Sequence, residues 1–235
     1  MSVVATLPMY DWPETRGAVE AFYAALRAQV PELPPQISRP DSEAALNALW
    51  RDPALLLGQT CWGPLRHGLS DHVEVLAQPT YDDVPGGRGI FYRSAIVMRE
   101  GPERHPPVAA GAVLPQGLAA LRPAINGPRS LSGAIALSED LSDPGLAARA
   151  LVTGSHRASV RAVADGLADF AAIDCRSWAL ALAHEPAARG LTVAGWTALR
   201  PGLPFITSRR TPPALRVRLA AALVGLGAER PALAA

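Results

Sequence analysis

The sequence predicts a two-lobed α/β protein in which each lobe is a mainly parallel sheet flanked by helices. Short apolar runs alternate with stretches of helical periodicity over the first 80 residues, and a second alternating set begins near Ala124. This order is typical of parallel strands covered by helices. Extended segments near 90–98 and 203–208 separate the two sets, so we expect the chain to cross between the lobes twice.

The first set supplies two helices and four strands. Residues 3–7 form an apolar run typical of a buried strand, and Asp11 with Glu14 has the spacing of a capping box for a helix that ends before Pro31. Asp41 or Ser42 would cap the second helix. The other strands of this set are expected at 36–38, 55–57 and 72–77.

The second set has the same alternation. A helix from Ser130 or Ser132 to about residue 141 follows the first strand of this set, and Gly166 suits the end of a later helix. We expect lobe 1 to hold residues 1–90 plus 206–235, and lobe 2 to hold residues 91–205. Strands are expected at 124–126, 151–153, 169–173, 191–195 and 204–207, and the remaining helices at 155–165, 176–184 and, amphipathic, 212–226.

Composition limits the function. The chain has 235 residues with 22 basic and 21 acidic side chains, and every basic one is arginine. The net charge of +1 gives no reason to expect nucleic-acid binding or docking on a membrane surface, and the absence of lysine excludes a lysine nucleophile. No apolar run reaches the ~20 residues of a membrane helix. The first residues lack the basic region of a secretory signal, which indicates a cytoplasmic protein, or a periplasmic one whose leader was removed.

Ligands of open α/β sheets sit beyond the carboxyl ends of strands, so the strand-to-helix junctions are the candidate site. In lobe 1 these are Tyr10 after the first strand and Thr60, Cys61 and Trp62 after the third. Capping and packing explain each junction equally well when it is taken alone. Tyr81 and Tyr92 are further candidates.

In lobe 2, three junctions bring hydroxyl, imidazole and carboxylate groups to strand ends. Ser130, Leu131 and Ser132 stand at one helix start, His156 and Ser159 near another, and Asp174 after a strand. Unpaired N–H groups and the helix dipole bind anions without a cation. Ordinary caps remain the alternative for each. Together the junctions predict a cleft that holds a small oxyanion, with no metal, no cofactor and no catalytic acid/base pair.

Three segments resemble the phosphate/phosphite/phosphonate family of ABC-transporter substrate-binding proteins. These are Asn-Gly-Pro-Arg-Ser-Leu-Ser-Gly at 126–133, Thr-Gly-Ser-His-Arg-Ala-Ser at 153–159 and the strand that ends at Asp174. The resemblance implies a type 2 periplasmic-binding fold. It also implies that Ser130 and Ser132 hold the oxyanion, that His156 and Ser159 add donors, and that Asp174 accepts from an amine or a protonated oxygen.

The leading hypothesis is therefore a solute-binding protein for a phosphonate- or phosphate-like anion, monomeric and not an enzyme, with an ABC-transporter permease as possible partner. By the same resemblance, Tyr10 and residues 60–62 would close the cleft from lobe 1. The alternatives are an enzyme of the same fold acting on a small anionic metabolite, and a cytosolic ligand sensor.

Overall fold

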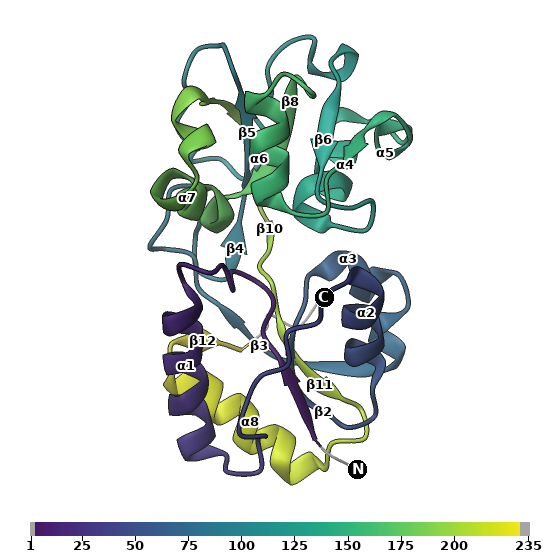
Figure 1. Ribbon diagram of the computed structural model, residues 1–235, viewed down its shortest axis with the longest axis vertical. Coiled ribbons are helices and arrows are strands. Elements are labelled where there is room, and N and C mark those ends of the chain that lie inside the picture. Colours follow the sequence, from purple (N-terminus) through teal and green to yellow (C-terminus); the bar gives the residue numbers. More distant parts are fainter. Residues whose placement is uncertain (1–2, 231–235) are drawn as a thin grey trace. The chain divides into compact units, whose positions relative to one another are not determined.

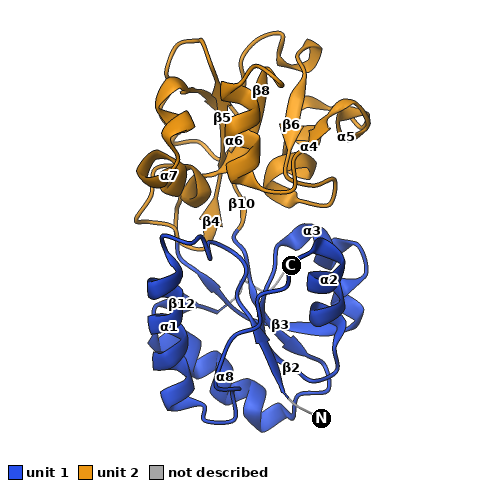
Figure 2. Ribbon diagram, in the orientation of Figure 1, with its two compact units in different colours: residues 1–80, 202–235 blue, residues 81–201 orange. Residues whose placement is uncertain are grey.

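The computed structural model describes residues 3–230, and the chain forms two compact units (Figures 1 and 2). Unit 1 comprises residues 1–80 and 202–235, and unit 2 comprises residues 81–201. The sequence placed these boundaries at 90/91 and 205/206. The first differs because the ring of Tyr81 packs against that of Tyr92, with 5.7 Å between ring centroids, inside unit 2. The second differs by only a few residues.

The sheet of unit 1 has the strand order β1-β2-β11-β3-β12. Strands β1 and β2 are parallel, whereas β11 runs antiparallel to both of its neighbours. The returning strand is thus inserted in the middle of the sheet, which makes the sheet mixed where sequence predicted mainly parallel pairing. The strands are β1 (Val4–Thr6), β2 (Leu55–Gln59), β3 (Val73–Pro79), β11 (Phe205–Ser208) and β12 (Ala228–Glu229).

Helices cover both faces of this sheet (Figure 1). On one face α1 and α8 enclose a core that includes Leu26, Leu57 and Leu223, and on the other α2 and α3 pack over Trp50, Leu55 and Ile206. All these side chains are almost completely buried. The helices are α1 (Arg16–Gln29), α2 (Glu43–Arg51), α3 (Trp62–Arg66) and α8 (Pro213–Gly225), with a short 3-10 turn η1 (Leu69–Asp71).

Unit 2 contains a second five-stranded sheet, in the order β7-β6-β8-β5-β9, and a small ladder of β4 with β10. Strands β7, β6 and β8 are parallel, and β5 runs antiparallel to β8 and β9. The α/β class with two lobes is therefore as predicted. The strands are β4 (Phe91–Tyr92), β5 (Ser94–Met98), β6 (Pro123–Ile125), β7 (Leu151–Val152), β8 (Phe170–Asp174), β9 (Thr192–Trp196) and β10 (Arg200–Pro201).

The helices of unit 2 pack on both faces of its sheet (Figure 1). Ile125, Leu137, Leu146 and Phe170 form one core cluster, in which side chains of α4 and α5 meet the strands. The helical elements are η2 (Leu118–Ala120), the π-helical turn η3 (Leu131–Ile135), α4 (Ala136–Leu141), α5 (Leu146–Arg149), α6 (His156–Ala164), α7 (Cys175–His184) and η4 (Pro186–Gly190).

Three local predictions were wrong, two of them because tertiary contacts compete with the sequence pattern. The capping box at Asp11 does not form: Thr15 is the N-cap of α1, and the Asp11 carboxylate instead pairs with Arg39 Nε at 2.6 Å. The expected strand at 90–98 is broken at Arg93, whose guanidinium donates to backbone carbonyls of the 107–111 loop. Residues 36–38 form no strand, although Ser38 N–H donates to Ala5 O at 2.7 Å.

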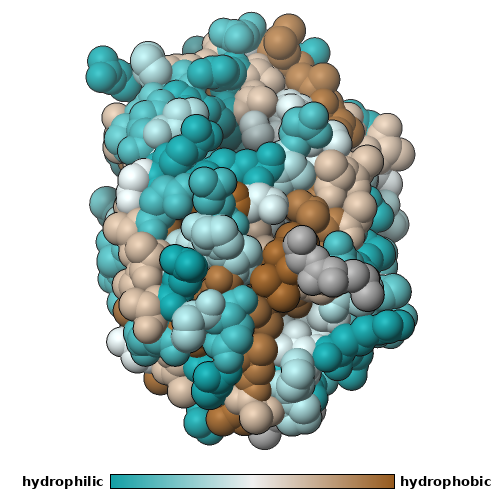
Figure 3. All heavy atoms as spheres, turned by 60° about the horizontal axis from the view of Figure 1, so that its bottom comes forward, coloured by the Kyte–Doolittle hydropathy of each residue, from teal (hydrophilic) through white to brown (hydrophobic). Residues whose placement is uncertain are grey.

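Helix α8 is less amphipathic than the sequence predicted. It buries Leu219 and Leu223 but exposes 68% of Val217 and 40% of Val224. Figure 3 shows apolar side chains reaching the surface among hydrophilic ones on the face that it displays. Apolar residues of α8 are thus not confined to the face that packs on the sheet.

Candidate anion-binding site

The candidate site in unit 2 lies at the carboxyl edge of three parallel strands. Strand β6 pairs with both β7 and β8, so the three strands end at the same edge of the sheet. The turn that follows β6 carries Ser130 and Ser132, the one after β7 carries His156, and β8 itself ends at Asp174. The fold therefore brings together the three junctions of the second lobe that the sequence singled out.

The turn after β6 is a π-helical turn, which is rare and is often found at functional sites. Ser130 caps it: the Ser130 hydroxyl oxygen accepts the Gly133 N–H at 3.2 Å. Gly133 lies close to Asn126, and a Cβ at 133 would overlap Asn126 Oδ1 unless that side chain or the turn shifted. Leu131 is fully buried, and its side chain packs in the interior of unit 2. The expected helix start exists, with Ser130 as its cap and Ser132 inside the turn.

Ser132, His156 and Asp174 are in direct contact. Ser132 Oγ lies 2.8 Å from His156 Nε2, and Asp174 Oδ2 lies 3.3 Å from the same nitrogen. Ser132 and Asp174 are 5% and 2% exposed, and Ser130 Oγ lies 3.3 Å from Ser132 Oγ. Asp174 also caps α7, since its Oδ1 accepts the Ser177 N–H at 3.0 Å. The capping and functional interpretations of Asp174 are thus compatible, because each uses a different carboxylate oxygen.

This arrangement is not that of a catalytic Ser-His-Asp triad. In such a triad the carboxylate and the serine contact opposite nitrogens of the imidazole, so that the ring can take the serine proton while the carboxylate orients it. Here Ser132 and Asp174 both contact Nε2. The imidazole therefore links a hydroxyl to a carboxylate without the geometry that activates a nucleophile.

Burial lowers the pKa of His156 below its ordinary value of 6.5, and the nearby Asp174 carboxylate opposes that shift only in part. The ring is therefore neutral at pH 7. Because a carboxylate can only accept, the contact with Asp174 favours the tautomer with hydrogen on Nε2. Within residues 3–230, His156 Nδ1 and Asn126 Oδ1 are buried acceptors without a hydrogen-bond partner. A buried polar atom without a partner lowers the stability of the folded state, so such atoms are often found where a ligand binds.

Ser159, a predicted donor, lies close by but is engaged elsewhere. Its hydroxyl lies 2.7 Å from Thr153 Oγ1, which in turn donates to Ile125 O at 3.1 Å. Ser159 is 1% exposed. Its contacts therefore hold the turn between β7 and α6 against the end of β6.

The candidates of unit 1 follow two neighbouring strands. Tyr10 comes after β1 and adopts a left-handed φ of 67°, and Thr15 Oγ1 donates to its carbonyl at 2.6 Å. Thr60 and Cys61 follow β2, where Thr60 N–H donates to Pro204 O at 3.1 Å. Trp62 begins α3, and its indole N–H donates to Gly202 O at 2.8 Å. The hydroxyls of Thr60 and Thr6 are buried, and within residues 3–230 neither has a hydrogen-bond partner.

Tyr81 is not part of either group. Its ring is completely buried in unit 2, next to Tyr92 and 5.2 Å beneath the Arg176 guanidinium. Asn126 directly follows β6 and begins the 126–133 segment that the sequence singled out, but the sequence assigned it no role of its own. Sequence reasoning missed Ser94, whose contacts involve residues far away in the sequence.

Residues 4–235 match the family model described as "ABC transporter, phosphonate, periplasmic substrate-binding protein". The chain belongs to this family. Members of this family are the substrate-binding components of ABC transporters, and they are described as periplasmic. A search of curated protein sequences gives no match. Among the described residues, no helix has both the length and the apolar character needed to cross a membrane.

Solved structures of similar fold include a methylphosphonate complex and a component of a phosphonate transporter. PhnD1 of Prochlorococcus marinus, in complex with methylphosphonate, has a TM-score of 0.70 and 17% identity, over 96% of this chain and 85% of that one. A binding-protein component of an ABC phosphonate transporter from Pseudomonas aeruginosa has a TM-score of 0.67 and 17% identity, over 97% and 80%. A histidine kinase sensor domain has a TM-score of 0.63 and 15% identity, over 97% and 98%. At these identities the likeness shows the two-lobed fold.

Proposed function

We propose that the protein binds a phosphonate- or phosphate-like anion at the cluster of Ser130, Ser132, His156 and Asp174, and delivers it to an ABC transporter. The observation that carries this proposal is the meeting of Ser132, His156 and Asp174 within 3.3 Å at one edge of the sheet. Membership of the phosphonate-binding family supports the same ligand class. The periplasm is the location consistent with this role.

The ligand oxygens would be held by neutral donors. The Ser130 and Ser132 hydroxyls lie 3.3 Å apart at the start of η3, next to the N–H groups of Leu131 and Ser132, and the chain has no lysine. Backbone N–H groups and hydroxyls at a helix start stabilise an oxyanion even without a formal positive charge. This arrangement accepts phosphate, phosphonate and carboxylate oxygens alike.

Asp174 would select among these anions. A buried carboxylate repels a fully deprotonated oxyanion, but it accepts a hydrogen bond from a ligand that carries an O–H or an ammonium group. A hydrogen phosphonate, hydrogen phosphate or aminoalkylphosphonate meets this requirement, whereas sulfate and sulfonates without an amino group, such as methanesulfonate, carry no such proton at neutral pH. We therefore propose that the site prefers phosphorus oxyanions to sulfur oxyanions.

The experiment is a thermal-shift and calorimetry panel of methylphosphonate, inorganic phosphate, sulfate and methanesulfonate. A phosphorus oxyanion at 100 times its Kd should stabilise the protein by about 2.7 kcal/mol. His156→Ala and Ser132→Ala should each weaken binding about ten- to a hundredfold: Ser132→Ala leaves a ligand oxygen without its donor, and His156→Ala removes the imidazole that contacts Ser132 and Asp174. No stabilisation by any phosphorus oxyanion would refute the proposed function.

Ser42 provides the matched control. Its hydroxyl oxygen caps α2 in unit 1 by accepting the Ala45 N–H at 3.2 Å. Ser42→Ala should cost about 1 kcal/mol of stability and leave the affinity unchanged. Equal loss of affinity in Ser42→Ala and Ser132→Ala would mean that the losses come from weakened folding.

The similarity to a histidine kinase sensor domain favours one second candidate, a ligand sensor. A sensor would bind the same anion but would leave its uptake unaffected. Deleting the gene and measuring uptake of radiolabelled methylphosphonate separates the two: loss of uptake supports transport, and unchanged uptake supports sensing.

A further inference from the structure

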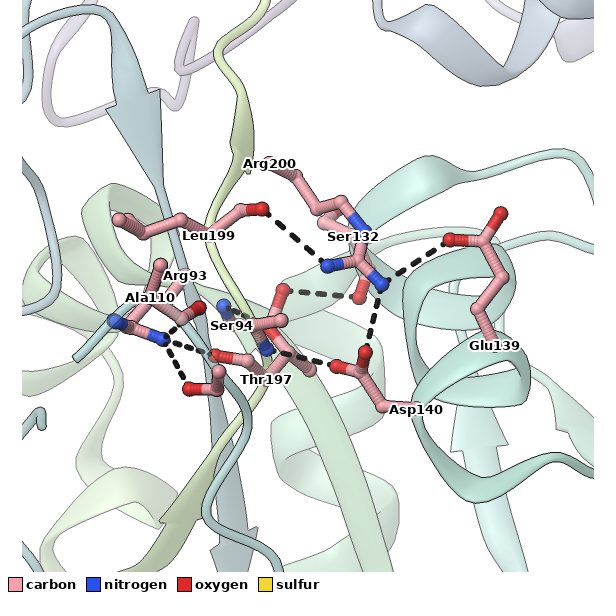
Figure 4. Close-up of polar contacts among 11 residues, drawn as sticks. Arg93, Ser94, Ala110, Ser132, Glu139, Asp140, Thr197, Leu199 and Arg200 are labelled. Atoms are coloured by element: carbon pink, nitrogen blue, oxygen red, sulfur yellow. Dashed lines mark hydrogen bonds and ion pairs between the residues drawn. The ribbon is translucent and has the colours of Figure 1, made fainter.

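Ser94 lies at the centre of a hydrogen-bond network in unit 2 that joins the candidate anion site to two segments distant in sequence (Figure 4). It is the first residue of β5 and is fully buried. In the β5–β8 ladder it stands directly opposite Asp174. Its hydroxyl donates to the Ser132 carbonyl oxygen at 3.0 Å. Ser94 thus contacts the two residues that flank His156 Nε2.

The backbone of Ser94 is fixed in turn by Thr197. The Ser94 N–H donates to Thr197 Oγ1 at 2.8 Å, and the Thr197 N–H donates back to Ser94 O at 3.0 Å. Thr197 is also fully buried, and its carbonyl accepts from Arg93 Nη1 at 2.8 Å. Two reciprocal bonds plus the guanidinium leave Ser94 little freedom to move away from the π turn.

The same turn is tied down at its other end. It continues into α4, whose Asp140 carboxylate accepts the Ala198 N–H at 2.8 Å and pairs with Arg200 Nη2 at 2.7 Å. Arg200 also contacts Glu139 at 3.1 Å, as Figure 4 shows. Residues 94 and 197–200 therefore hold η3 and α4 from both sides.

We propose that Ser94 is a positioning residue for the anion site: its hydroxyl holds the π turn so that Ser132 stays in contact with His156. A π turn has weaker internal support than an α turn, so outside contacts decide where its groups point. The Ser94 hydroxyl is such a contact, because it binds the backbone of the very residue whose side chain meets the imidazole. Its part in ligand binding rests on the proposed function.

The first readout needs no ligand. The imidazole ¹⁵N signals of His156, assigned by their loss in His156→Gln, report the contact between Nε2 and Ser132 Oγ. Ser94→Ala should shift these signals in the unliganded protein. Thr192→Val is the matched control: Thr192 lies on β9, the neighbour of β5, and within residues 3–230 its buried hydroxyl has no partner. This control should leave the signals unchanged.

The second readout is a double-mutant cycle on methylphosphonate affinity. Ser94→Ala should weaken binding about five- to thirtyfold, because a buried carbonyl loses its donor and the turn shifts. If Ser94 acts through Ser132, the double variant Ser94→Ala/Ser132→Ala should bind within about twofold of Ser132→Ala alone, whereas independent residues would give additive losses. Ser94→Cys, with a weaker donor of similar size, should fall between Ser94→Ala and the wild type.

Unchanged His156 signals in a folded Ser94→Ala protein would overturn the proposal, and so would fully additive losses in the cycle. If Ser94→Ala does not fold, Ser94→Cys provides the same two readouts. If the wild type binds no phosphorus oxyanion while Ser94→Ala still shifts the His156 signals, the positioning role stands and the proposed function fails.

Discussion

The folded state disfavours the protonated, charged form of His156. Burial lowers the pKa of the imidazole below 6.5, and the Asp174 carboxylate opposes this shift only in part. In the unfolded chain the same ring titrates near its ordinary value. As the pH falls through 6.5, the unfolded state therefore takes up a proton that the folded state does not. The unfolding free energy falls accordingly, whereas above 6.5 both states are neutral at this ring and the effect disappears.

We predict that the unfolding free energy of the unliganded protein decreases between pH 7.5 and pH 5.5, and that His156→Gln reduces this decrease. The contribution of one such group is at most about 1.4 kcal/mol per pH unit. Urea unfolding of both proteins over this range measures it. Parallel curves for wild type and variant would show that His156 does not titrate differently in the two states.

A second residue-scale prediction concerns Gly133. A methyl group there would overlap the Asn126 side-chain oxygen, so Gly133→Ala should force the buried Asn126 side chain or the π turn to move and cost about 1–3 kcal/mol. Affinity for the anion should fall with it, since Ser132 lies in the same turn. Gly127→Ala is the control from the same loop, because a Cβ at 127 has no neighbour within 4 Å and the residue does not have a left-handed φ. Thermal unfolding and calorimetry would compare the two variants, and equal stability would contradict the prediction.

At the scale of elements, Glu185 joins α6 to the end of α7. It caps η4, is 5% exposed, and its Oε2 accepts from Arg157 Nε at 2.8 Å and from Arg161 Nε at 2.8 Å. Burial alone would raise its pKa, but the hydrogen bonds from Arg157 and Arg161 outweigh burial and hold the pKa at about 2.

We predict that Glu185→Ala lowers the unfolding free energy by about 2 kcal/mol at pH 7, because two arginines lose a charged acceptor. Since the carboxyl of the unfolded chain titrates near 4.5, its stabilising contribution should be complete above that pH and should decline as the pH falls toward 2. The difference in unfolding free energy between wild type and variant should therefore become smaller as the pH falls. Thermal unfolding at pH 7, 4 and 3 checks this, with the exposed Glu103→Ala as control. A gap that does not change with pH would contradict the assignment.

Most elements could be predicted from apolar periodicity, but the contacts between distant segments could not. The expected strands form at 55–59, 170–174 and 205–208. Their side chains are buried whichever element packs against them, so the apolar runs alone predict them. The capping pattern at Asp11 failed because the residue that competes for its carboxylate, Arg39, is 28 positions away.

The same distinction holds for the site. Ser130, Ser132 and His156 each follow a strand end and Asp174 is the last residue of its strand, so the parallel topology brings them together. Ser94 begins a strand, and its partners are 38 and 103 positions distant, so no local pattern marks it. The sequence also could not show that Tyr81 is buried, because an exposed and a packed tyrosine look alike in a sequence.

At the scale of the molecule, the two units differ in how many segments of the chain form them. Unit 2 is one continuous segment, residues 81–201, whereas the sheet of unit 1 has β11 as its middle strand. We predict that a chain truncated after Pro201 keeps unit 2 folded and loses unit 1, because β2 and β3 no longer have the strand that joins them. Limited proteolysis should leave a resistant fragment that begins near residue 81. An equally resistant fragment from residues 1–80 would contradict this.

The central place of β11 also sets an order of events on the ribosome. Chains emerge at about 5–20 residues per second, and domains generally fold as units as they appear. Residues 81–201 are all synthesised before residues 205–208, so unit 2 can fold first. During that time β2 and β3 lack β11, the strand that lies between them in the sheet, and their apolar faces are not yet covered. During that interval the first 80 residues are the part of the nascent chain that a chaperone would bind.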